Sequence, residues 1–251
     1  MKIFITMSAY NEEKSIPPLF DAIIDTFNNS NYSYQIVLID DGSSDKTVEV
    51  VESYATKAPI KIITHIINKG LGEGIKTAIR QTLKIASDED IMVCMDADNT
   101  HHPKYILPMI RKIEEGFDII IASRFRRGSK QIGVPFLRKI ISFGARITFK
   151  IFLNLKDVKD YTCGFRAFRV KTVREAYNKF GEDIITRKGF ACTDELLLNL
   201  LTITKKISEV PFVLHYNKKG SISKLKLWTT VKATLAMLLA YKKSSAKRNR
   251  K

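Results

Sequence analysis

The chain has 251 residues, of which 45% are hydrophobic, and its 42 Lys and Arg against 26 Asp and Glu give a formal net charge of +16. This length and hydrophobic content suit one large α/β domain, or one domain with a small appendage, and exclude a globally disordered chain. The positive charge predicts a polyanionic ligand or environment, which nucleic acid, an anionic membrane surface or a phosphorylated substrate would supply. Cys94, Cys163 and Cys192 lack the spacing of disulfide pairs or metal ligands, which favours a reducing compartment.

The N-terminal segment is interpreted as a buried strand rather than a signal sequence, because its apolar run covers only about six residues and acids follow it. No uninterrupted apolar run approaches the roughly 20 residues that cross a bilayer. We therefore expect no integral membrane segment in this sequence.

In the first half, short apolar runs alternate with amphipathic stretches. The expected strands are Ile3–Thr6, Ile36–Ile39, Ile60–Thr64, Ile91–Met95 and Asp118–Ala122. The expected helices are Ile16–Phe27, Asp45–Ala55, Glu73–Ile85 and Pro103–Glu115. This alternation predicts an α/β fold with a mostly parallel sheet covered by helices on both faces. Ligands of such sheets bind at the carboxyl ends of the strands.

From about residue 124 the pattern changes. An acid-free basic loop, Arg124–Lys139, precedes an amphipathic stretch over Lys139–Leu155. The further expected elements are a strand at Phe165–Arg169, helices at Lys171–Phe180 and Thr193–Thr202, and a strand at Ile207–Leu214. The last segment, Lys242–Lys251, has six basic residues in ten and is expected to be disordered.

Asp96 and Asp98 follow the predicted strand Ile91–Met95. Two carboxylates one residue apart can hold one hard cation, and Mg²⁺ or Mn²⁺ would keep positions open for phosphate oxygens. Such a cation would neutralise a diphosphate leaving group. A zinc site at His101 and His102 is disfavoured because no third ligand has suitable spacing, and both are interpreted as residues at the start of a helix.

Polar residues follow all five predicted strands of the first half. They are Tyr10, Asn11 and Glu12, then Asp40 and Asp41, then Asn68–Gly72, then Asp96 and Asp98, and finally Arg124. We expect these residues on one rim of the sheet. Asp40 or Asp41 could accept hydrogen bonds from a nucleobase or ribose, while Ser44 or Asp45 suits a helix cap. Asn68–Gly72 lacks the spacing of a Walker loop, so by itself it predicts only a turn that starts a helix.

Six segments occur in a recognisable order: Tyr10–Glu12, Asp40–Ser43, Asn68–Gly72, Asp96–Asp98, Ser123–Phe125 and Asp160–Arg166. Together they resemble the family 2 glycosyltransferases with a GT-A, Rossmann-like fold, and within them the dolichol-phosphate mannose synthases and related polyprenyl-phosphate glycosyltransferases. The resemblance covers roughly residues 3–225. We expect a catalytic domain at 1–224, an amphipathic C-terminal helix at 225–241 and a basic tail at 242–251.

The resemblance implies roles for individual residues. The donor nucleotide would be held by Tyr10, Glu12, Asp40 or Asp41, Asp96 and Lys224, and the metal ion by Asp96 and Asp98. The acceptor phosphate would be held by Arg124, Arg138 and Ser142, and the catalytic residues would be Asp98, Arg124 and Arg138. Two departures stand out: Thr100 replaces a Gln that often completes the metal shell, and Lys218 or Lys219 replaces an Arg before the Gly-x-Ser-Lys segment.

The implied reaction is inverting transfer of a hexose, as mannose from GDP-mannose or glucose from UDP-glucose, onto a polyprenyl or dolichyl phosphate with Mg²⁺ or Mn²⁺. A lipid phosphate is largely ionised near neutral pH, so it needs positioning by arginines more than a general base. Transfer to a glycan or protein hydroxyl, the main alternative, would need a base such as Asp194 or Glu195. A nucleic-acid-binding protein is disfavoured, because the chain lacks a recognisable module and has few aromatics among its basic clusters.

Two amphipathic stretches, Lys139–Leu155 and 225–241, combine apolar faces with basic side chains and would suit a bilayer interface. For the first stretch, packing in the protein core is an equal alternative. We therefore expect peripheral attachment to the cytoplasmic face of a membrane with anionic lipid. A membrane-anchoring subunit is a further candidate partner.

Overall fold

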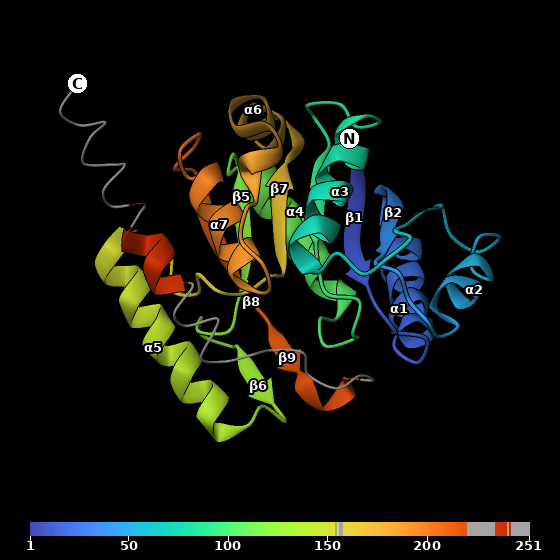
Figure 1. Cartoon of the computed structure of the whole chain (residues 1–251), viewed down its shortest axis with the longest axis horizontal. Helices are drawn as coiled ribbons and strands as arrows, with labels where there is room; N and C mark the ends of the chain where they lie inside the picture. The colour runs from blue at the N-terminus through green and yellow to red at the C-terminus, as the bar shows by residue number, and fades with distance from the viewer. Residues whose placement is uncertain (154, 156–157, 220–233, 240, 242–251) are drawn as a thin grey trace.

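A computed structural model describes residues 1–153, 155, 158–219, 234–239 and 241. Its main sheet has seven strands in the order β3-β2-β1-β4-β7-β5-β8 (Figure 1). These strands are β1 (Lys2–Ala9), β2 (Ser33–Asp40), β3 (Ile60–Thr64), β4 (Ile91–Cys94), β5 (Ile119–Ser123), β7 (Arg166–Arg169) and β8 (Ile207–Pro211). A separate parallel pair is formed by β6 (Lys130–Ile132) and β9 (Val213–His215).

Helices cover both faces of the main sheet. They are α1 (Ile16–Asn28), α2 (Thr47–Glu52), α3 (Leu71–Leu83), α4 (Ile106–Glu114), α5 (Phe136–Leu153), α6 (Val170–Phe180) and α7 (Ala191–Leu200), with short 3-10 turns η1 (Pro103–Tyr105), η2 (Gly181–Ile184) and η3 (Tyr216–Lys218). On one face, α3 packs on β1 and β2 and meets α6 and α7. On the other, α4 packs on β5 and β7, and both α1 and α4 contact η1. The prediction that helices cover both faces of the sheet is confirmed.

The sheet is parallel except at β7, which runs antiparallel to both β4 and β5. The first-half strands and helices lie where the sequence predicts them, within a few residues at each end. The single strand predicted over Ile207–Leu214 is wrong. Proline at position 211 has no N–H for a sheet hydrogen bond, so β8 ends there and the chain turns away to form β9. The short strand β6, inside the basic loop, was not predicted.

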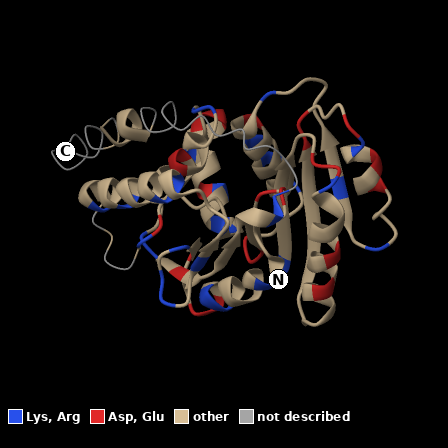
Figure 2. Ribbon diagram, turned by 90° about the horizontal axis from the view of Figure 1, so that it is seen from below, with Lys and Arg blue, Asp and Glu red and all other residues tan. Residues whose placement is uncertain are grey.

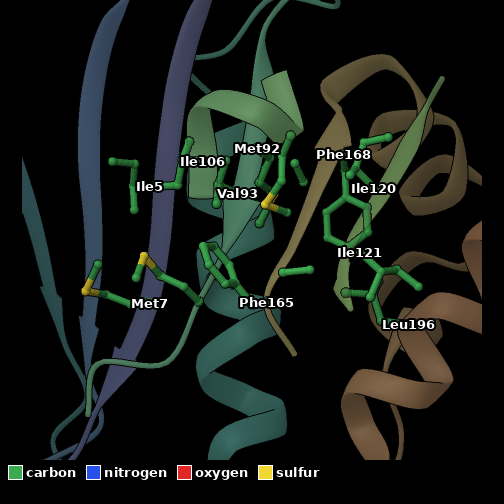
Figure 3. Close-up of a cluster of buried hydrophobic side chains, with 14 of the residues drawn as sticks. Ile5, Met7, Met92, Val93, Ile106, Ile120, Ile121, Phe165, Phe168 and Leu196 are labelled. Atoms are coloured by element: carbon green, nitrogen blue, oxygen red, sulfur yellow. The ribbon is translucent and has the colours of Figure 1, made fainter. Parts of the chain in front are cut away.

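The core explains why the strands are continuous apolar runs. Side chains of β1, β4, β5 and β7 are buried on both faces of the sheet, as parallel sheets covered by helices require (Figure 3). Phe165 lies in this cluster and stacks on His101, with ring centroids 5.0 Å apart. The core therefore continues up to the residues that follow Asp96 and holds that loop in place.

Helix α5 confirms the predicted amphipathic helix but begins three residues earlier than the stretch from Lys139, at Phe136. In the C-terminal segment, residues 234–239 are helical, and Met237 and Leu238 are buried. The rest of the helix expected at 225–241, apart from Tyr241, lies outside the described residues, as do Lys224 and the basic tail. Among the residues that the structure describes, no helix is both long and apolar enough to cross a membrane.

Candidate active site

The loops after β1, β2, β3 and β4 meet at one rim of the sheet, as predicted from the order of strands and helices. Asn11, with φ 56°, has left-handed backbone, and its side-chain oxygen accepts a hydrogen bond from Ser44 N at 2.8 Å. Its own N–H donates to Ser43 Oγ at 2.9 Å. The segment that begins at Tyr10 is thereby joined to the turn after β2. Glu12, 8% exposed, accepts a hydrogen bond from Ser15 Oγ at 2.8 Å at the start of α1.

Asp40 and Asp41 are both buried but have different surroundings. Both oxygens of Asp40 lie at the limit of hydrogen bonding from Ser43 N, at 3.3 and 3.4 Å. Gly42 adopts φ +73°, and a Cβ there would come within 2.8 Å of Asn68 N. Only glycine therefore allows the turn after β2 to lie directly against the loop after β3.

The carboxylate of Asp41 organises that loop. Its Oδ1 accepts hydrogen bonds from Lys69 N at 2.9 Å and His65 Nδ1 at 2.7 Å, and its Oδ2 accepts from Gly70 N at 2.7 Å. The other ring nitrogen of His65 lies 3.0 Å from Thr77 Oγ1 on α3. Sequence reasoning missed His65, whose only local signal is a polar residue directly after a strand. Of the two aspartates, Asp40 keeps the weaker protein contacts and so the greater capacity to accept from a ligand.

Asp96 and Asp98 follow β4, and their carboxylates differ in exposure. The side chain of Asp96 is 38% exposed, whereas that of Asp98 is 11% exposed. Asp98 Oδ1 accepts hydrogen bonds from Thr100 N at 3.1 Å and Thr100 Oγ1 at 2.6 Å. Asp98 Oδ2 forms an ion pair with Lys219 Nζ. Burial alone would raise the pKa of Asp98, but the positive charge of Lys219 and these hydrogen bonds outweigh burial and lower it.

The two histidines after this pair have structural roles. His101 Nδ1 accepts a hydrogen bond from Asp96 N at 3.3 Å, and its Nε2 lies 3.9 Å from Asp96 Oδ2. His102 Nδ1 accepts from Lys104 N at 3.2 Å and caps η1. The interpretation of His102 as a residue at the start of a helix is confirmed, and His101 positions Asp96.

Asp96 and Asp98 offer the hard oxygen ligands that Mg²⁺ and Mn²⁺ prefer. The protein itself places a cation, Lys219, on one of these oxygens, so the site accepts positive charge. Within the described parts of the chain, no third His, Cys, Asp or Glu joins the pair. A metal ion would take its other ligands from water and phosphate, the usual pattern for Mg²⁺. The Thr100 hydroxyl is already directed at Asp98. The pair therefore fits a divalent cation bound together with a diphosphate.

Arg124, expected at the acceptor phosphate, forms a two-point ion pair with Asp160. Its Nε and Nη2 donate to the two carboxylate oxygens at 2.8 and 2.7 Å, and Nη2 also donates to Thr162 Oγ1 at 2.7 Å. Burial alone would lower the pKa of Arg124, but the charge of Asp160 raises it. Among the guanidinium nitrogens, Nη1 is the one that these hydrogen bonds leave for a ligand. The backbone of Asp160 is held in turn by Glu209, whose Oε1 accepts its N–H at 2.6 Å.

Arg138, the second predicted arginine, lies at the N-terminal end of α5. Its Nη1 donates to Tyr216 Oη at 2.8 Å, and its guanidinium lies 5.0 Å from the centre of that ring. Tyr216 O in turn accepts a hydrogen bond from Lys219 N, and Lys219 pairs with Asp98, so the fold connects the predicted acceptor arginine to the predicted metal site. Ser142 lies four residues further along α5, on the same face of the helix as Arg138, and is half-buried.

The sequence does not predict a buried pair, Arg166 and Asp194, that lies next to the loop of Asp96. Arg166 on β7 donates from Nη2 to Tyr161 O at 2.6 Å and from Nη1 to Thr193 O, and its Nη2 lies 3.9 Å from Asp194 Oδ1. Burial lowers the pKa of Arg166 and raises that of Asp194 to about 7. Gly164 lies beside this pair, and a Cβ there would be 3.8 Å from Asp96 Oδ1. Burial of Arg166 thus supports the loop that passes Asp96.

A mostly parallel α/β sheet with an acidic pair after its fourth strand, one acid of which pairs with a lysine, is typical of the GT-A glycosyltransferases. The chain belongs to glycosyl transferase family 2, whose family model matches residues 4–176. It is 35% identical over 227 residues to a dolichol-phosphate mannosyltransferase of Pyrococcus furiosus, covering 90% of this chain and 60% of that protein. It is 30% identical over 221 residues to an undecaprenyl-phosphate mannosyltransferase of Micrococcus luteus, covering 88% of this chain and 86% of that protein.

Solved structures agree on the fold. Glucosyl-3-phosphoglycerate synthase from Mycobacterium tuberculosis, in complex with Mn²⁺, uridine diphosphate and phosphoglyceric acid, superposes with a TM-score of 0.69 at 19% identity. The match covers 96% of this chain and 78% of that one. The predicted GT-A fold and family are therefore confirmed.

Proposed function

We propose that the protein transfers a hexose from a nucleotide sugar onto a polyprenyl phosphate. The relatives named as dolichol-phosphate and undecaprenyl-phosphate mannosyltransferases support this acceptor, and they favour mannose over glucose as the transferred sugar. The observation that carries the proposal is the position of Arg138. It donates a hydrogen bond to Tyr216 in η3, the turn that Lys219 of the Asp98 ion pair closes, and it lies on α5, a helix with an exposed apolar face.

The apolar face of α5 would receive the lipid. Its large exposed side chains recur every three or four residues: Phe136, Ile140, Phe143, Ile147 and Ile151. Phe136 is 78% exposed and Ile151 is 74% exposed, so the stripe spans nearly the whole helix. Lys and Arg but no Asp or Glu lie along α5 (Figure 2). Such a helix suits the interface of a bilayer that contains anionic lipid, on the cytoplasmic face where nucleotide sugars are available.

On the donor side, Tyr10, Glu12 and Asp40 would contact the nucleoside. Asp41 would act through the loop of Lys69 and Gly70, and Lys224 would contact the diphosphate. Asp96 and Asp98 would hold Mg²⁺ or Mn²⁺, which when bound would offset negative charge on the departing diphosphate.

On the acceptor side, Arg138, Ser142 and the outer nitrogen of Arg124 would position the lipid phosphate. One phosphate oxygen attacks the anomeric carbon while the bond from that carbon to the nucleoside diphosphate breaks. This single displacement inverts the anomeric centre. Fixed guanidinium groups favour it by holding the nucleophile in line without transferring a proton.

The contacts of two other carboxylates favour this acceptor over a hydroxyl group. Glu195 accepts hydrogen bonds from Thr186 N, Thr186 Oγ1 and Arg187 N, at 2.7, 2.6 and 2.8 Å. Asp194 is 3% exposed and lies against Arg166. A hydroxyl acceptor would need a general base, for which these two carboxylates are the candidates, and both are held by other groups. A lipid phosphate needs none.

The test is incubation of the full chain with Mg²⁺ or Mn²⁺, polyprenyl phosphate and radiolabelled GDP-mannose or UDP-glucose. We expect the label in a lipid-extractable product that mild acid hydrolyses, with the anomeric configuration inverted. Label transferred instead to an added glycan or protein, with none in the lipid fraction, would contradict the proposed acceptor.

A further inference from the structure

The ammonium group of Lys219 occupies one oxygen of the acidic pair. Its Nζ contacts Asp98 Oδ2, and the two side chains are only 17% and 11% exposed. Because Thr100 N and Oγ1 donate to Oδ1, protein groups hold both oxygens of Asp98. The protein therefore supplies the hydrogen bonds and the counter-charge of the Asp98 carboxylate without an ion from solution.

A divalent cation needs that same oxygen. Oδ2 is the oxygen that Thr100 leaves for a ligand, and the lysine ammonium lies on it. Two positive charges at one carboxylate oxygen repel each other, most strongly where water is largely excluded. Lys219 and a metal ion consequently compete for Asp98.

We propose that Lys219 is an internal competitor of the metal ion, holding Asp98 while the donor site is empty and leaving it when a nucleoside diphosphate binds. The proposal rests on the assignment of Asp96 and Asp98 to the metal under the proposed function. A diphosphate supplies strong oxygen acceptors for the displaced ammonium. Metal and nucleotide therefore bind with positive coupling, and metal alone binds weakly.

The position of Lys219 in the chain connects this exchange to the acceptor side. Its N–H donates to Tyr216 O at 3.3 Å and closes the turn η3. Tyr216 Oη accepts the hydrogen bond from Arg138, and Asn217 packs so closely on Gly133 that a Cβ there would be 2.9 Å from Asn217 N. A movement of η3 that takes Lys219 off Asp98 therefore acts on Arg138 and on the loop before α5.

Titration of the full chain with Mn²⁺ in the absence of nucleotide, followed by the EPR signal of the free ion, tests the proposal without an activity assay. Lys219→Met removes the ammonium and keeps most of the side chain's length. We expect it to bind Mn²⁺ about tenfold more tightly than the wild type, or better, because the competing state is lost. Lys219→Arg keeps a cation at this position and should retain the weak affinity.

Lys218→Met is the matched control. Lys218 is exposed and adjacent, so this change removes the same charge without touching Asp98, and it should alter Mn²⁺ affinity less than about twofold. A second measurement adds GDP or UDP: the nucleotide should improve Mn²⁺ binding by a larger factor in the wild type than in Lys219→Met.

Equal Mn²⁺ affinities for the wild type and Lys219→Met, with binding lost in Asp98→Asn, would overturn the proposal and leave the metal assignment intact. An equal gain in Lys218→Met and Lys219→Met would also overturn it, since the effect would then be one of general charge. If Mn²⁺ binds neither the wild type nor Lys219→Met, even with GDP or UDP, both the metal assignment and the competition fail.

Discussion

Asp160 holds Arg124 through two parallel hydrogen bonds at 2.8 and 2.7 Å, and the carboxylate of this pair is fully buried. This relationship makes Arg124 rigid. Its guanidinium cannot turn toward a ligand without leaving its partner, so an acceptor phosphate would meet an arginine whose orientation is already set.

The ion pair also predicts a stability effect. Asp160→Asn should lower the free energy of unfolding by about 3–5 kcal/mol, because it leaves the buried charge of Arg124 without its counter-charge. Urea unfolding at pH 7 measures this loss. Asp88→Asn is the control, because Asp88 pairs with Arg174 at the surface and its loss should cost less than about 1 kcal/mol. Equal losses in the two variants would mean that Asp160 adds nothing beyond a surface pair.

The stabilisation that the Asp160–Arg124 ion pair provides should depend on pH. Burial alone would raise the pKa of Asp160, but Arg124 lowers it below its unfolded value, which is about 3.9. The stabilisation is therefore fully present above the unfolded pKa and is lost as the pH falls toward the folded pKa. The difference in unfolding free energy between the wild type and Asp160→Asn should shrink below about pH 4. A difference that stays constant to pH 2.5 would be inconsistent with this origin.

Asp194 should give the unfolding free energy a pH dependence of the opposite sign. Burial raises its pKa to about 7 in the folded state, so between roughly pH 4 and pH 7 the folded protein binds more protons than the unfolded chain. Stability arising from this group falls as the pH rises through that window. In Asp194→Asn this part of the pH dependence should disappear, as measured by urea unfolding at several pH values. The same slope in the variant and the wild type would rule out Asp194 as its source.

Asp98→Ala should abolish metal-dependent transfer, with a loss on the order of 10³-fold or more, because the donor diphosphate loses its metal ligand. Radiolabel transfer to the lipid measures the rate, and circular dichroism checks the fold. Asp88→Ala, which removes a surface carboxylate, should retain normal activity. Full transfer by Asp98→Ala would refute the metal assignment.

His65→Phe should raise the KM for the donor and cost about 1–3 kcal/mol of stability, because Asp41 loses one of its three hydrogen-bond donors in a buried position. Thr77→Val, which removes the outer contact of His65 together with a 3.5 Å contact from Arg80 Nη2, is the matched variant and should cost about 1 kcal/mol with little change in KM. Steady-state kinetics with varied donor and urea unfolding measure both effects. A KM unchanged in His65→Phe would show that the loop does not depend on this histidine.

Replacing Phe136 and Ile151 together by Glu should weaken binding to vesicles with anionic lipid by at least about tenfold, since each exposed side chain would bury apolar surface in the bilayer. Co-sedimentation with vesicles measures it, and unfolding should be unaffected because both side chains are exposed. Ile66→Glu alters an even more exposed isoleucine, 98% accessible, in the loop after β3, and this variant should bind vesicles normally. Equal weakening in both variants would argue against α5 as the membrane contact.

Much of the site could be predicted from local sequence pattern. Alternation of apolar runs and amphipathic stretches predicts parallel strands, and the carboxyl ends of such strands must meet at one rim. For this reason the positions of Asp40, Asp96 and Asp98 follow from the sequence. The amphipathic spacing likewise predicts α5, although it does not separate the first residues of the helix, Phe136 and Leu137, from the preceding basic loop.

Only the tertiary structure decided which charges pair. Arg124 meets Asp160 across 36 residues, and Asp98 meets Lys219 across 121. Nothing in the local pattern distinguishes these partners from other acids and lysines. The same holds for β7, whose antiparallel position between β4 and β5 depends on which edges the earlier strands leave unpaired. Periodicity is a property of neighbouring residues. It specifies the helices and strands, and the edge of the sheet at which the polar residues after the strands meet. Ion pairs form between side chains that packing brings together, so they depend on the whole fold.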